Sequence, residues 1–590
     1  MKLHMVELAK SGAKLALSMA LVGHFLTAAQ AESATSNARP LSNSLAGNYL
    51  AARIAATDKD TQSAADYYRR AIALDPDNNS LKLKGFLSFI GNGDIEEGVE
   101  LGQQISKTGN EPEIVSLVLS VEDIRKKNWP GAERRLTQNW RSAVDRLMAG
   151  LVMGWVKLGS DKVAEALETV DALKGPAWFD LFVQYHGGLI ALSSGDTDEA
   201  IKRLDAAFNN RAGGQAATDT YLRIIAALAQ AHFRANDVEK AKGVVEEALK
   251  RSPQNPIFER MKQNLAEGKG LSAGVSSPHV GAAEVFLNLG TAINREGGQE
   301  FARIYLQLAH TLTPQEDAVT SKLAELLDGQ GMLLRANTLF ESIKTDSPYY
   351  RIARLERALN LDELEDLEAA RAELDSLVES GPDDLVTHLS YGAVLARHED
   401  HLGAIDVYSK IIARIKKPSR IHWSLFYRQG IGYERTKQWP KAEAAFQKAL
   451  ELNPNQPSVL NYLGYSWVDM DMNLQAGLDM IRKAVDLRPN DGYMVDSLGW
   501  AYYKLGRMQE AVVELERAVE LRPGDPTIND HLGDAYWKAN RKLEATFQWQ
   551  HALALDPPKA DIARIEEKLE DGLDAVEKRE AAAEKNPDKG

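Results

Sequence analysis

Apolar and small residues recur along this chain in a pattern that is typical of helices arranged in tandem pairs. From Trp423 to Pro558 the apolar residues follow the three-to-four-residue spacing of amphipathic helices, and turn residues interrupt them at a constant interval. Gly430, Gly464, Gly499 and Gly533 hold the same place in this interval, at spacings of 34, 35 and 34 residues. The pattern predicts four helical hairpins of one design.

Each small residue of the repeat has a structural role. The Gly and an Ala about 12 residues later allow the two helices of a hairpin to cross closely, and a Pro ends the second helix because it lacks an N–H. A second Ala lies where one hairpin meets the next. The third copy carries Leu498, Gly499, Tyr502, Gly506, Ala511, Leu515, Ala518 and Pro523 at these positions. A period of about 34 residues with these positions is the signature of the tetratricopeptide repeat, or TPR.

The same period extends upstream, so the predicted fold is an all-α TPR solenoid, a right-handed superhelix of about a dozen hairpins. Gly290, Ala324, Ala358 and Gly392 stand 34 residues apart. Residues 81–173 fit the pattern less well and are interpreted as degenerate repeats. The predicted domains are a signal peptide at 1–31, a partly degenerate N-terminal TPR-like array at 32–265, a joint at 266–282, a C-terminal TPR array at 283–560, and a capping helix with a disordered tail at 561–590.

The joint contains the longest Gly- and Ser-rich stretch of the chain, from Gly268 to Pro278. Gly and Ser in this density predict a loop between two subarrays. Long loops in compact proteins are often functional, so the alternative is a loop that lies in the binding groove.

Residues 1–31 resemble a secretory signal. Lys2, Lys10 and Lys14 precede an apolar run from Leu15 to Leu26, and Ala29-Gln30-Ala31 fits a cleavage site. A short membrane anchor is the alternative, but the run is well below the roughly 20 apolar residues that a spanning helix needs. The sequence therefore predicts a periplasmic protein, with no integral membrane segment after signal cleavage.

Charge and cysteine content narrow the classes of partner. The formal net charge is −14, and removal of the signal, with three Lys and one Glu, leaves −16. A chain this acidic is a poor ligand for nucleic acid or anionic lipid surfaces, so we expect protein partners and no nucleic acid. The chain has no Cys, which excludes disulfides, thiolate metal sites and a lipid-modified Cys after the signal.

The sequence carries no motif typical of an enzyme. The 12 His residues show no metal-binding spacing, and no nucleophile elbow, P-loop or dinucleotide fingerprint occurs. Asp530, His531 and Asp534 lie close together on one predicted helix, which suggests a metal site or an acid–base pair. Polar residues that line a groove explain them more simply. We therefore expect no catalytic residues, no cofactor and no metal.

What remains is protein binding. In a TPR hairpin the first helix faces the concave surface of the superhelix, which solenoids use to hold ligands. When the anchor Gly is counted as position 8, positions 2, 5, 6, 9, 12 and 13 point inward. The candidate protein-binding residues are Tyr427, Arg428, Asn461, Tyr462, Tyr465, Tyr493, Asp496, Trp500, Tyr503, Lys504, Asp530, His531, Asp534 and Trp537, and the same count adds Glu434, Arg435 and Lys538.

These residues indicate a kind of ligand. They lack the Lys and Asn arrangement by which chaperone-binding TPRs clamp a C-terminal carboxylate, so that class is rejected. Tyr and Trp are favoured interface anchors because they bury a large area and keep a polar tip. Together with the acidic groups they suit an amphipathic, partly basic helix or peptide. The alternative is that some of the aromatic rings pack between neighbouring first helices.

Four strings resemble a group of exported bacterial TPR proteins: Leu460-Asn-Tyr-Leu-Gly-Tyr-Ser-Trp467, Asp496-Ser-Leu-Gly-Trp-Ala-Tyr502, Asp530-His-Leu-Gly-Asp-Ala-Tyr-Trp537 and Gly281-Ala-Ala-Glu-Val-Phe-Leu-Asn-Leu-Gly290. The group includes the LbcA-type adaptors, periplasmic lipoproteins that activate a carboxyl-terminal processing protease and bring it cell-wall hydrolases. The resemblance is specific from Gly281 to Pro558. It implies a non-catalytic periplasmic scaffold with such a protease and peptidoglycan hydrolases as partners. This chain differs from those adaptors in one respect: it has no Cys to which the lipid anchor of a lipoprotein could be attached.

The expected function is therefore a periplasmic adaptor that holds partner proteins in its concave groove. Support of a carboxyl-terminal processing protease and turnover of cell-wall hydrolases is the leading hypothesis. A scaffold for envelope polysaccharide export or outer-membrane assembly is the alternative, because TPR arrays also occur there. Oligomeric state is left open.

Overall fold

A computed structural model describes residues 44–109, 111–210, 213–214, 217–252, 255–271, 274–294 and 298–584. The predicted signal peptide, the predicted leader as far as residue 43, Ser272 and Ala273 of the predicted joint, and the predicted tail from residue 585 lie outside the described residues. The chain divides into two compact units, residues 1–92 and residues 93–590.

The first unit contains three described helices. They are α2 (Leu45–Thr57), α3 (Thr61–Leu74) and α4 (Asn79–Asn92). Helices α2 and α3 form a hairpin, and α4 packs on α3. The predicted anchors Ala52, Ala64, Tyr68 and Ala71 are all buried in this unit.

The second unit is also built from helical pairs. Its first part comprises α5 (Ile95–Ser106), α6 (Glu113–Arg125), α7 (Trp129–Leu136), α8 (Ala143–Gly159), α9 (Val163–Asp171), α10 (Phe179–Ser194), α11 (Thr197–Asn209), α13 (Thr218–Arg234), α14 (Val238–Arg251), α15 (Pro256–Ala266), α16 (Pro278–Ile293) and α17 (Gln299–Leu312).

The remaining helices complete this unit. They are α18 (Asp317–Gly329), α19 (Leu333–Ser342), α20 (Tyr350–Glu363), α21 (Leu367–Ser380), α22 (Leu385–Arg397), α23 (His401–Arg414), the 3₁₀ turn η1 (Arg420–His422), α24 (Trp423–Arg435), α25 (Trp439–Leu452), α26 (Pro457–Asp469), α27 (Leu474–Leu487), α28 (Gly492–Lys504), α29 (Met508–Leu521), α30 (Pro526–Lys538), α31 (Lys542–Ala554), α32 (Lys559–Asp571) and α33 (Leu573–Glu584).

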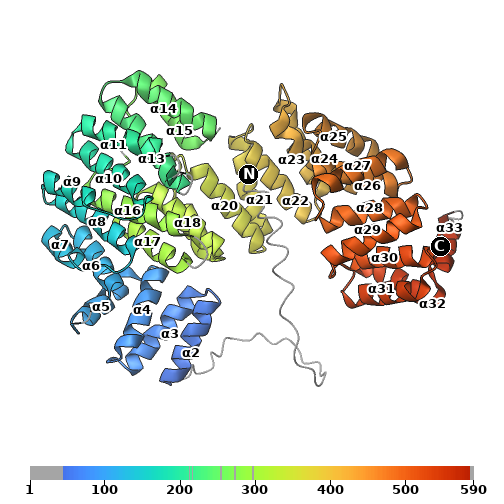
Figure 1. Cartoon of the computed structure of the whole chain (residues 1–590), viewed down its shortest axis with the longest axis horizontal. Helices are drawn as coiled ribbons and strands as arrows, with labels where there is room; N and C mark the ends of the chain where they lie inside the picture. Colours follow the sequence, from blue (N-terminus) through green and yellow to red (C-terminus); the bar gives the residue numbers. More distant parts are fainter. Residues whose placement is uncertain are drawn as a thin grey trace. The chain divides into compact units, whose positions relative to one another are not determined.

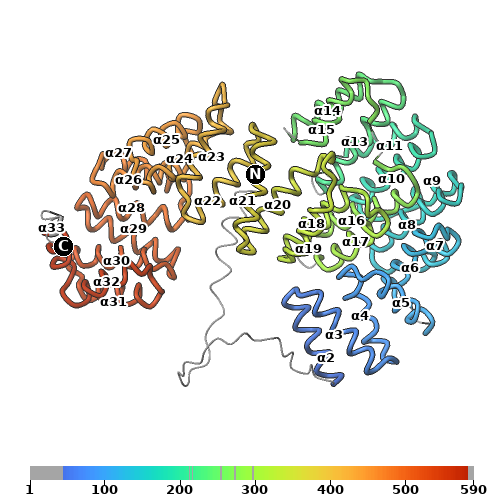
Figure 2. Tube along the Cα trace, turned by 180° about the vertical axis from the view of Figure 1, so that it is seen from behind, coloured from blue at the N-terminus to red at the C-terminus, as the bar shows by residue number. Residues whose placement is uncertain are grey.

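Successive helices pair along the chain, as Figures 1 and 2 show. The first helix of each pair is here called helix A and the second helix B, and each B helix packs on the A helix of the following pair in most of the array. The part of the chain that the structure describes contains no strand. The all-α TPR fold predicted from the period is therefore confirmed. In residues 81–173, where the pattern is weakest, α5 to α9 are nevertheless helices.

The turn between helix A and helix B has a repeated local design. A residue with positive φ ends helix A, and an Asp then caps helix B by accepting a hydrogen bond from a backbone N–H three residues on. Glu365 (φ 65°) followed by Asp366 is one example, in which the Asp366 side chain accepts from the Ala369 N–H. The cap satisfies one of the N–H groups that a helix start leaves unpaired.

Close crossing of helices A and B explains the anchor glycines. A Cβ added to Gly464 in α26 would lie 2.8 Å from the carbonyl oxygen of Gly477 in α27. Because that neighbour is backbone, it cannot rotate away. The sequence pattern predicted small residues at this crossing, and the structure supplies the reason.

The C-terminal end differs from the single capping helix expected within residues 561–590. Two helices, α32 and α33, occupy this stretch, and Gly572 separates them with φ +83°. Left-handed backbone is unfavourable for residues with a Cβ, so this Gly ends α32. Residues 581–584, which were expected to be disordered, are part of α33.

We expect Gly464→Ala to destabilise the folded chain by about 1–3 kcal/mol, because the added methyl group must push the two helices apart. Gly524→Ala is the control, since nothing lies within 4 Å of a Cβ at that position. Urea unfolding of both variants measures the difference. Equal losses in the two variants would show that the close crossing does not limit stability.

Candidate functional site

Each A helix packs on its B helix with one side, and its opposite side faces away from the B helix. These opposite sides of successive A helices form one surface, here called the A-helix face, and the candidate residues lie on it. Within the second unit, helix α16 shows that positions counted from the anchors do point to this face. It packs on α8, α10 and α13, which are the A helices of three successive pairs. Its contacts there are Trp155, Tyr185 and Arg223, which occupy counted positions 9, 5 and 2. The chain's own helix therefore covers this part of the A-helix face.

A buried polar network holds α16 in place. The Glu284 carboxylate accepts hydrogen bonds from Tyr185 (2.8 Å), from Arg223 (2.5 Å) and from Asn288 (3.0 Å). Burial alone would raise the pKa of Glu284, but the Arg223 guanidinium outweighs it and the pKa lies below its usual value. The carboxylate is therefore ionised and paired inside the protein.

His186 lies beside this network and is fully buried. Its Nδ1 accepts a hydrogen bond from the Trp155 Nε1–H at 3.2 Å, and burial lowers the pKa of His186 to about 4. The ring is therefore neutral at physiological pH. Gly281 packs directly on Trp155, where any Cβ would lie 2.2 Å from the indole.

At α24 and α26 the aromatic candidates pack mainly against one another. Tyr427 lies 6.0 Å, edge to face, from Tyr462, and Tyr462 donates a hydrogen bond to Glu434 at 3.0 Å. Burial raises the pKa of Tyr427 to about 12. These two rings show the packing between neighbouring A helices that the sequence analysis named as an alternative. On α24, Arg428 is half-buried and Arg435 is exposed.

Between α26 and α28 the candidates are partly accessible. Asn461 donates a hydrogen bond to Ser497 (3.2 Å), and Tyr465 is partly buried against the hydrophobic cluster of the last repeats. Tyr493 is exposed, with its ring beneath the Arg522 guanidinium at 4.5 Å. Lys504 pairs with Asp471 at 3.1 Å. Of these residues, Tyr493 offers the largest uncovered apolar surface.

Trp500 forms the centre of an aromatic stack on α28 and α30. Its ring is stacked on Tyr503 at 4.7 Å and on His531 at 4.1 Å. The His531 Nδ1 lies 2.9 Å from Asp496. Burial opposes the charged imidazolium, but the carboxylates of Asp496, Asp530 and Asp534 outweigh it and raise the pKa of His531.

Asp530 and Asp534 are engaged by a residue that the sequence analysis did not identify. Lys568 of α32, whose side chain is fully buried, lies 2.8 Å from a carboxylate oxygen of each. Trp549 also donates to Asp534 at 2.9 Å. Burial raises the pKa of Asp534 to about 6 in spite of Lys568. In the described part of the chain, no group of three or more His, Asp or Glu has a geometry that could hold a metal ion.

Trp537 and Tyr503 contact the second C-terminal helix. The Trp537 Nε1–H donates to Asp574 at 2.9 Å, and the Tyr503 hydroxyl donates to Glu577 at 3.1 Å. Lys538 pairs with the same two carboxylates. Helices α32 and α33 therefore lie on the A-helix face of α28 and α30.

One sequence signal could have revealed these contacts. Asp530 and Asp534 are four positions apart on an inward face, where two carboxylates need a cation. Lys568 lies between Ile565 and Leu569 on the apolar side of the last predicted helix. A Lys on the buried side of an amphipathic helix indicates an acidic partner. The carboxylates of α33 give no comparable signal, because they lie among many exposed charges.

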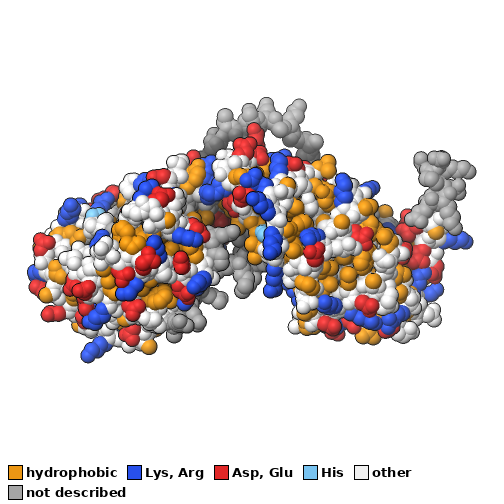
Figure 3. Space-filling model, turned by 90° about the horizontal axis from the view of Figure 1, so that it is seen from above, with side chains coloured by type: hydrophobic (Ala, Val, Ile, Leu, Met, Phe, Trp, Pro, Cys, Tyr) orange, Lys and Arg blue, Asp and Glu red, His pale blue; other side chains and the backbone are white. Residues whose placement is uncertain are grey.

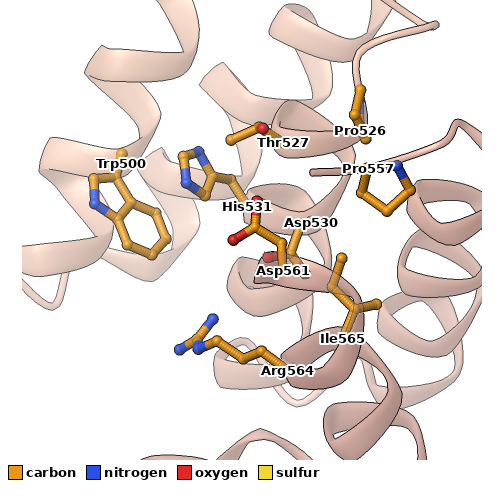
Figure 4. Close-up of a pocket in the computed structure, with 9 residues that line it drawn as sticks. All are labelled: Trp500, Pro526, Thr527, Asp530, His531, Pro557, Asp561, Arg564 and Ile565. Carbon is orange, nitrogen blue, oxygen red and sulfur yellow. The ribbon is translucent and has the colours of Figure 1, made fainter. Parts of the chain in front are cut away.

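A small cavity remains where α32 crosses this face. It has a volume of about 220 Å³ and is shown in Figure 4. Trp500 and His531 line one side, and Arg564 of α32 reaches toward them from the other. The Trp500 Nε1–H is buried and has no hydrogen-bond partner. The packing beneath α32 is therefore incomplete.

The face shown in Figure 3 carries both acidic and basic side chains. Hydrophobic side chains lie among them and gather more extensively over one half of the view. No helix in the described residues is both long and apolar enough to cross a membrane. The exposed surface is thus suited to contacts with other proteins through scattered apolar anchors.

Comparisons with known proteins agree with this architecture. Models described as tetratricopeptide repeat match residues 46–78, 191–265, 355–419 and 423–456, and one described as TPR repeat matches residues 499–540. The chain thus has an all-α tetratricopeptide-repeat fold, and such repeats point to a protein-binding scaffold.

Similarity to individual proteins is more limited. The TPR repeat-containing protein PA4667 of Pseudomonas aeruginosa is 27% identical over 88 residues, which are 15% of this chain and 15% of that protein. The solved structure of the APC/C heterotetramer Cut9–Hcn1 is 13% identical over 89% of this chain and 96% of its own, with a TM-score of 0.37. A tetratricopeptide repeat protein from Parabacteroides merdae is 14% identical over 43% and 97%, with a TM-score of 0.36.

We expect Glu284→Gln to destabilise the second unit by about 3 kcal/mol, because Arg223 is left without its counter-charge inside the protein. Glu246→Gln is the matched control, since Glu246 is exposed on α14. Urea unfolding compares the two. A loss no larger than that of the control would contradict a structural role for the network.

Because His186 is buried in its neutral form, we expect the stability of the folded chain to fall at acidic pH. An unfolded His takes up a proton below about pH 6.5, whereas the folded pKa of His186 is about 4. The stability that neutral His186 contributes is thus complete above pH 6.5 and is lost as pH falls toward 4, by up to about 3 kcal/mol. Melting temperatures between neutral pH and pH 4 should fall less in His186→Gln than in the wild type. Parallel curves would contradict this assignment.

Proposed function

We propose that this protein is an exported, non-catalytic adaptor that binds a helix of a partner protein on the A-helix face of its C-terminal repeats. One observation carries the proposal. The same kind of face, on α8, α10 and α13, already holds a helix, α16, through side chains at the counted inward positions. A face that binds a helix within the chain has the geometry to bind one from another chain.

The available part of this face supports the proposal. At position 2 of α20, α22 and α28 stand Ile352, Val386 and Tyr493, with exposed fractions of 40%, 43% and 48%. Apolar and aromatic side chains spaced along successive helices are the anchors by which a groove holds one side of an amphipathic helix. The polar candidates Arg428 and Asn461 lie between them on α24 and α26.

The proposed partners are a carboxyl-terminal processing protease and the cell-wall hydrolases on which it acts. This part of the proposal is supported by the resemblance of residues 281–558 to the LbcA-type adaptors. The proposed periplasmic location is supported by the basic, apolar and small-residue order of residues 1–31. Fractionation of cells that produce the full chain, with N-terminal sequencing of the product, tests location. A product retained in the cytoplasm with residues 1–31 intact contradicts it.

The partner-binding proposal predicts that Val386→Ser with Tyr493→Ser weakens partner binding about tenfold or more, because both substitutions remove exposed anchors. Leu402→Ser with Phe547→Ser is the matched control. It removes one aliphatic and one aromatic side chain of at least equal exposure from the B helices α23 and α31. Neither change opens a cavity in the core, so both variants should fold.

The measurement is in-cell crosslinking and affinity purification of wild type and both variants. Equal recovery of the same partners from the two double variants would show that the A-helix face is not the binding surface. Recovery of a polysaccharide synthase or an outer-membrane assembly protein in place of a protease would favour the alternative scaffold role. Purified protease, assayed on a cell-wall hydrolase with and without this chain, tests activation directly.

A further inference from the structure

Helix α33 covers the A-helix face of α28 and α30 mainly through polar contacts. Asp574 accepts from the Trp537 indole at 2.9 Å and from Lys538 at 2.7 Å. Glu577 accepts from Tyr503 at 3.1 Å and from Lys538 at 2.5 Å. Residues of two successive A helices thus recognise two carboxylates three positions apart on one helix.

These contacts hold α33 weakly. The side chains of Asp574 and Glu577 remain 64% and 39% exposed, and ion pairs at this exposure contribute little because water screens them. Among the side chains of α33 whose burial is described, Leu573 and Val576 are the buried apolar ones. A helix of 12 residues is marginal in water without packing. Ion pairs of Glu580 with Arg564 and of Arg579 with Glu567 and Asp571 join α33 to α32, and they are exposed as well. Helix α33 is therefore weakly held.

Helix α32 is held differently. Its Lys568 is fully buried between Asp530 and Asp534, and Ile565 is buried in the core of the last repeats. Removal of one member of such a buried ion pair is strongly destabilising. Gly572, with φ +83°, separates this anchored helix from α33. The backbone can rotate at this Gly, so α33 can leave while α32 stays.

Departure of α33 would uncover side chains suited to binding. Trp537 and Tyr503 would lose their acceptors, and Tyr503 continues the stack of Trp500 and His531. The unfilled cavity beside Trp500 lies next to this row (Figure 4). Two aromatic donors beside Lys538 form a surface that selects acidic groups on an apolar helix face.

We propose that α33 is a built-in occupant of a helix-binding site on α28 and α30, and that a partner helix with the same chemistry displaces it. The partner helix presents two carboxylates three residues apart, as Asp574 and Glu577 do, with an apolar residue between them in the place of Val576. This inference rests on the proposed function and defines its ligand at this end of the chain. It differs from the partly basic ligand expected from the sequence, because the contacts of α33 would select an acidic helix at this end of the chain.

Release of α33 can be measured without any partner. Asp574→Asn with Glu577→Gln removes both charges from the contact, and Glu566→Gln with Glu570→Gln makes the same chemical change at exposed positions of α32. Amide hydrogen exchange in α33 should become about tenfold faster in the first variant and stay at the wild-type rate in the second. Exchange in α32 should not change. Equal exchange of α33 in all three chains overturns the proposal.

Binding in trans is tested with a defined probe, a labelled synthetic peptide of residues 572–584. The Asp574→Asn/Glu577→Gln chain retains Tyr503, Trp537 and Lys538, so it should bind this peptide at least about tenfold more tightly than wild type, because its own α33 competes less. A version of the peptide with Asn and Gln at these two positions should bind weakly to every chain. Equal binding of the two peptides overturns the proposed selectivity.

A locked chain completes the test. Because the protein has no Cys, Arg564→Cys with Glu580→Cys can be joined by a short bismaleimide, which fixes α33 to α32 across a pair that lies 2.8 Å apart in the structure. The bridged chain should not bind the peptide, whereas the same chain without the reagent should. Binding by the bridged chain overturns displacement. These outcomes depend on the chain's own peptide, so they are independent of whether the protease or hydrolase partners are found.

Discussion

The dependence of each helical pair on its neighbours governs this structure. A pair with Gly and Ala at its crossing packs closely within itself, as Gly464 and Gly477 show, yet it leaves apolar surface on both sides. The next pair covers one side, which is why the array extends along the chain. The A-helix face is largely left over by this arrangement, because most B helices pack on the A helices of their own pair and of the following pair. In two places the chain covers it with a helix of its own.

The two covered places differ in physical character. Around α16 the contacts are apolar or deeply buried, and the ionised Glu284 is enclosed with Arg223 and Tyr185. Such an arrangement makes α16 a permanent part of the core. At α33 two apolar residues are buried, and the remaining contacts are made mainly by charged, partly exposed side chains. One solenoid thus contains a helix that is fixed in the A-helix face and another that is held loosely enough to be exchanged. The stretch between them carries the exposed Ile352 and Val386, and Tyr493 is exposed at the start of α28.

The sequence predicted the repeated features well, because the same physical requirement recurs every 34 residues. Gly499 must lie against Leu515 as Gly464 lies against Gly477, so the period reports helix crossing directly. The same period also indicated which positions of each A helix point to the A-helix face. Contacts between segments that are far apart in the sequence could not be predicted from the repeat pattern. The sequence around Glu284 fits an ordinary TPR helix, and nothing local shows that its carboxylate meets Arg223, which is 61 residues away. Likewise, Tyr427 and Tyr462 read as groove anchors, although their rings pack on each other.

The position of α16 in the chain order has a consequence for biosynthesis. The helices that surround it, α8 to α14, end at Arg251, and α16 begins only at Pro278. A ribosome or translocation channel releases the chain from its N-terminus, so these pairs emerge with Trp155 and Tyr185 uncovered and with no counter-charge for Arg223. The core of these helical pairs is complete only when α16 has also emerged, which requires about 40 residues after Arg251. During that interval the nascent chain exposes an apolar, cationic surface that the finished protein does not have. Folding of this half is therefore tied to the rate at which the chain is delivered.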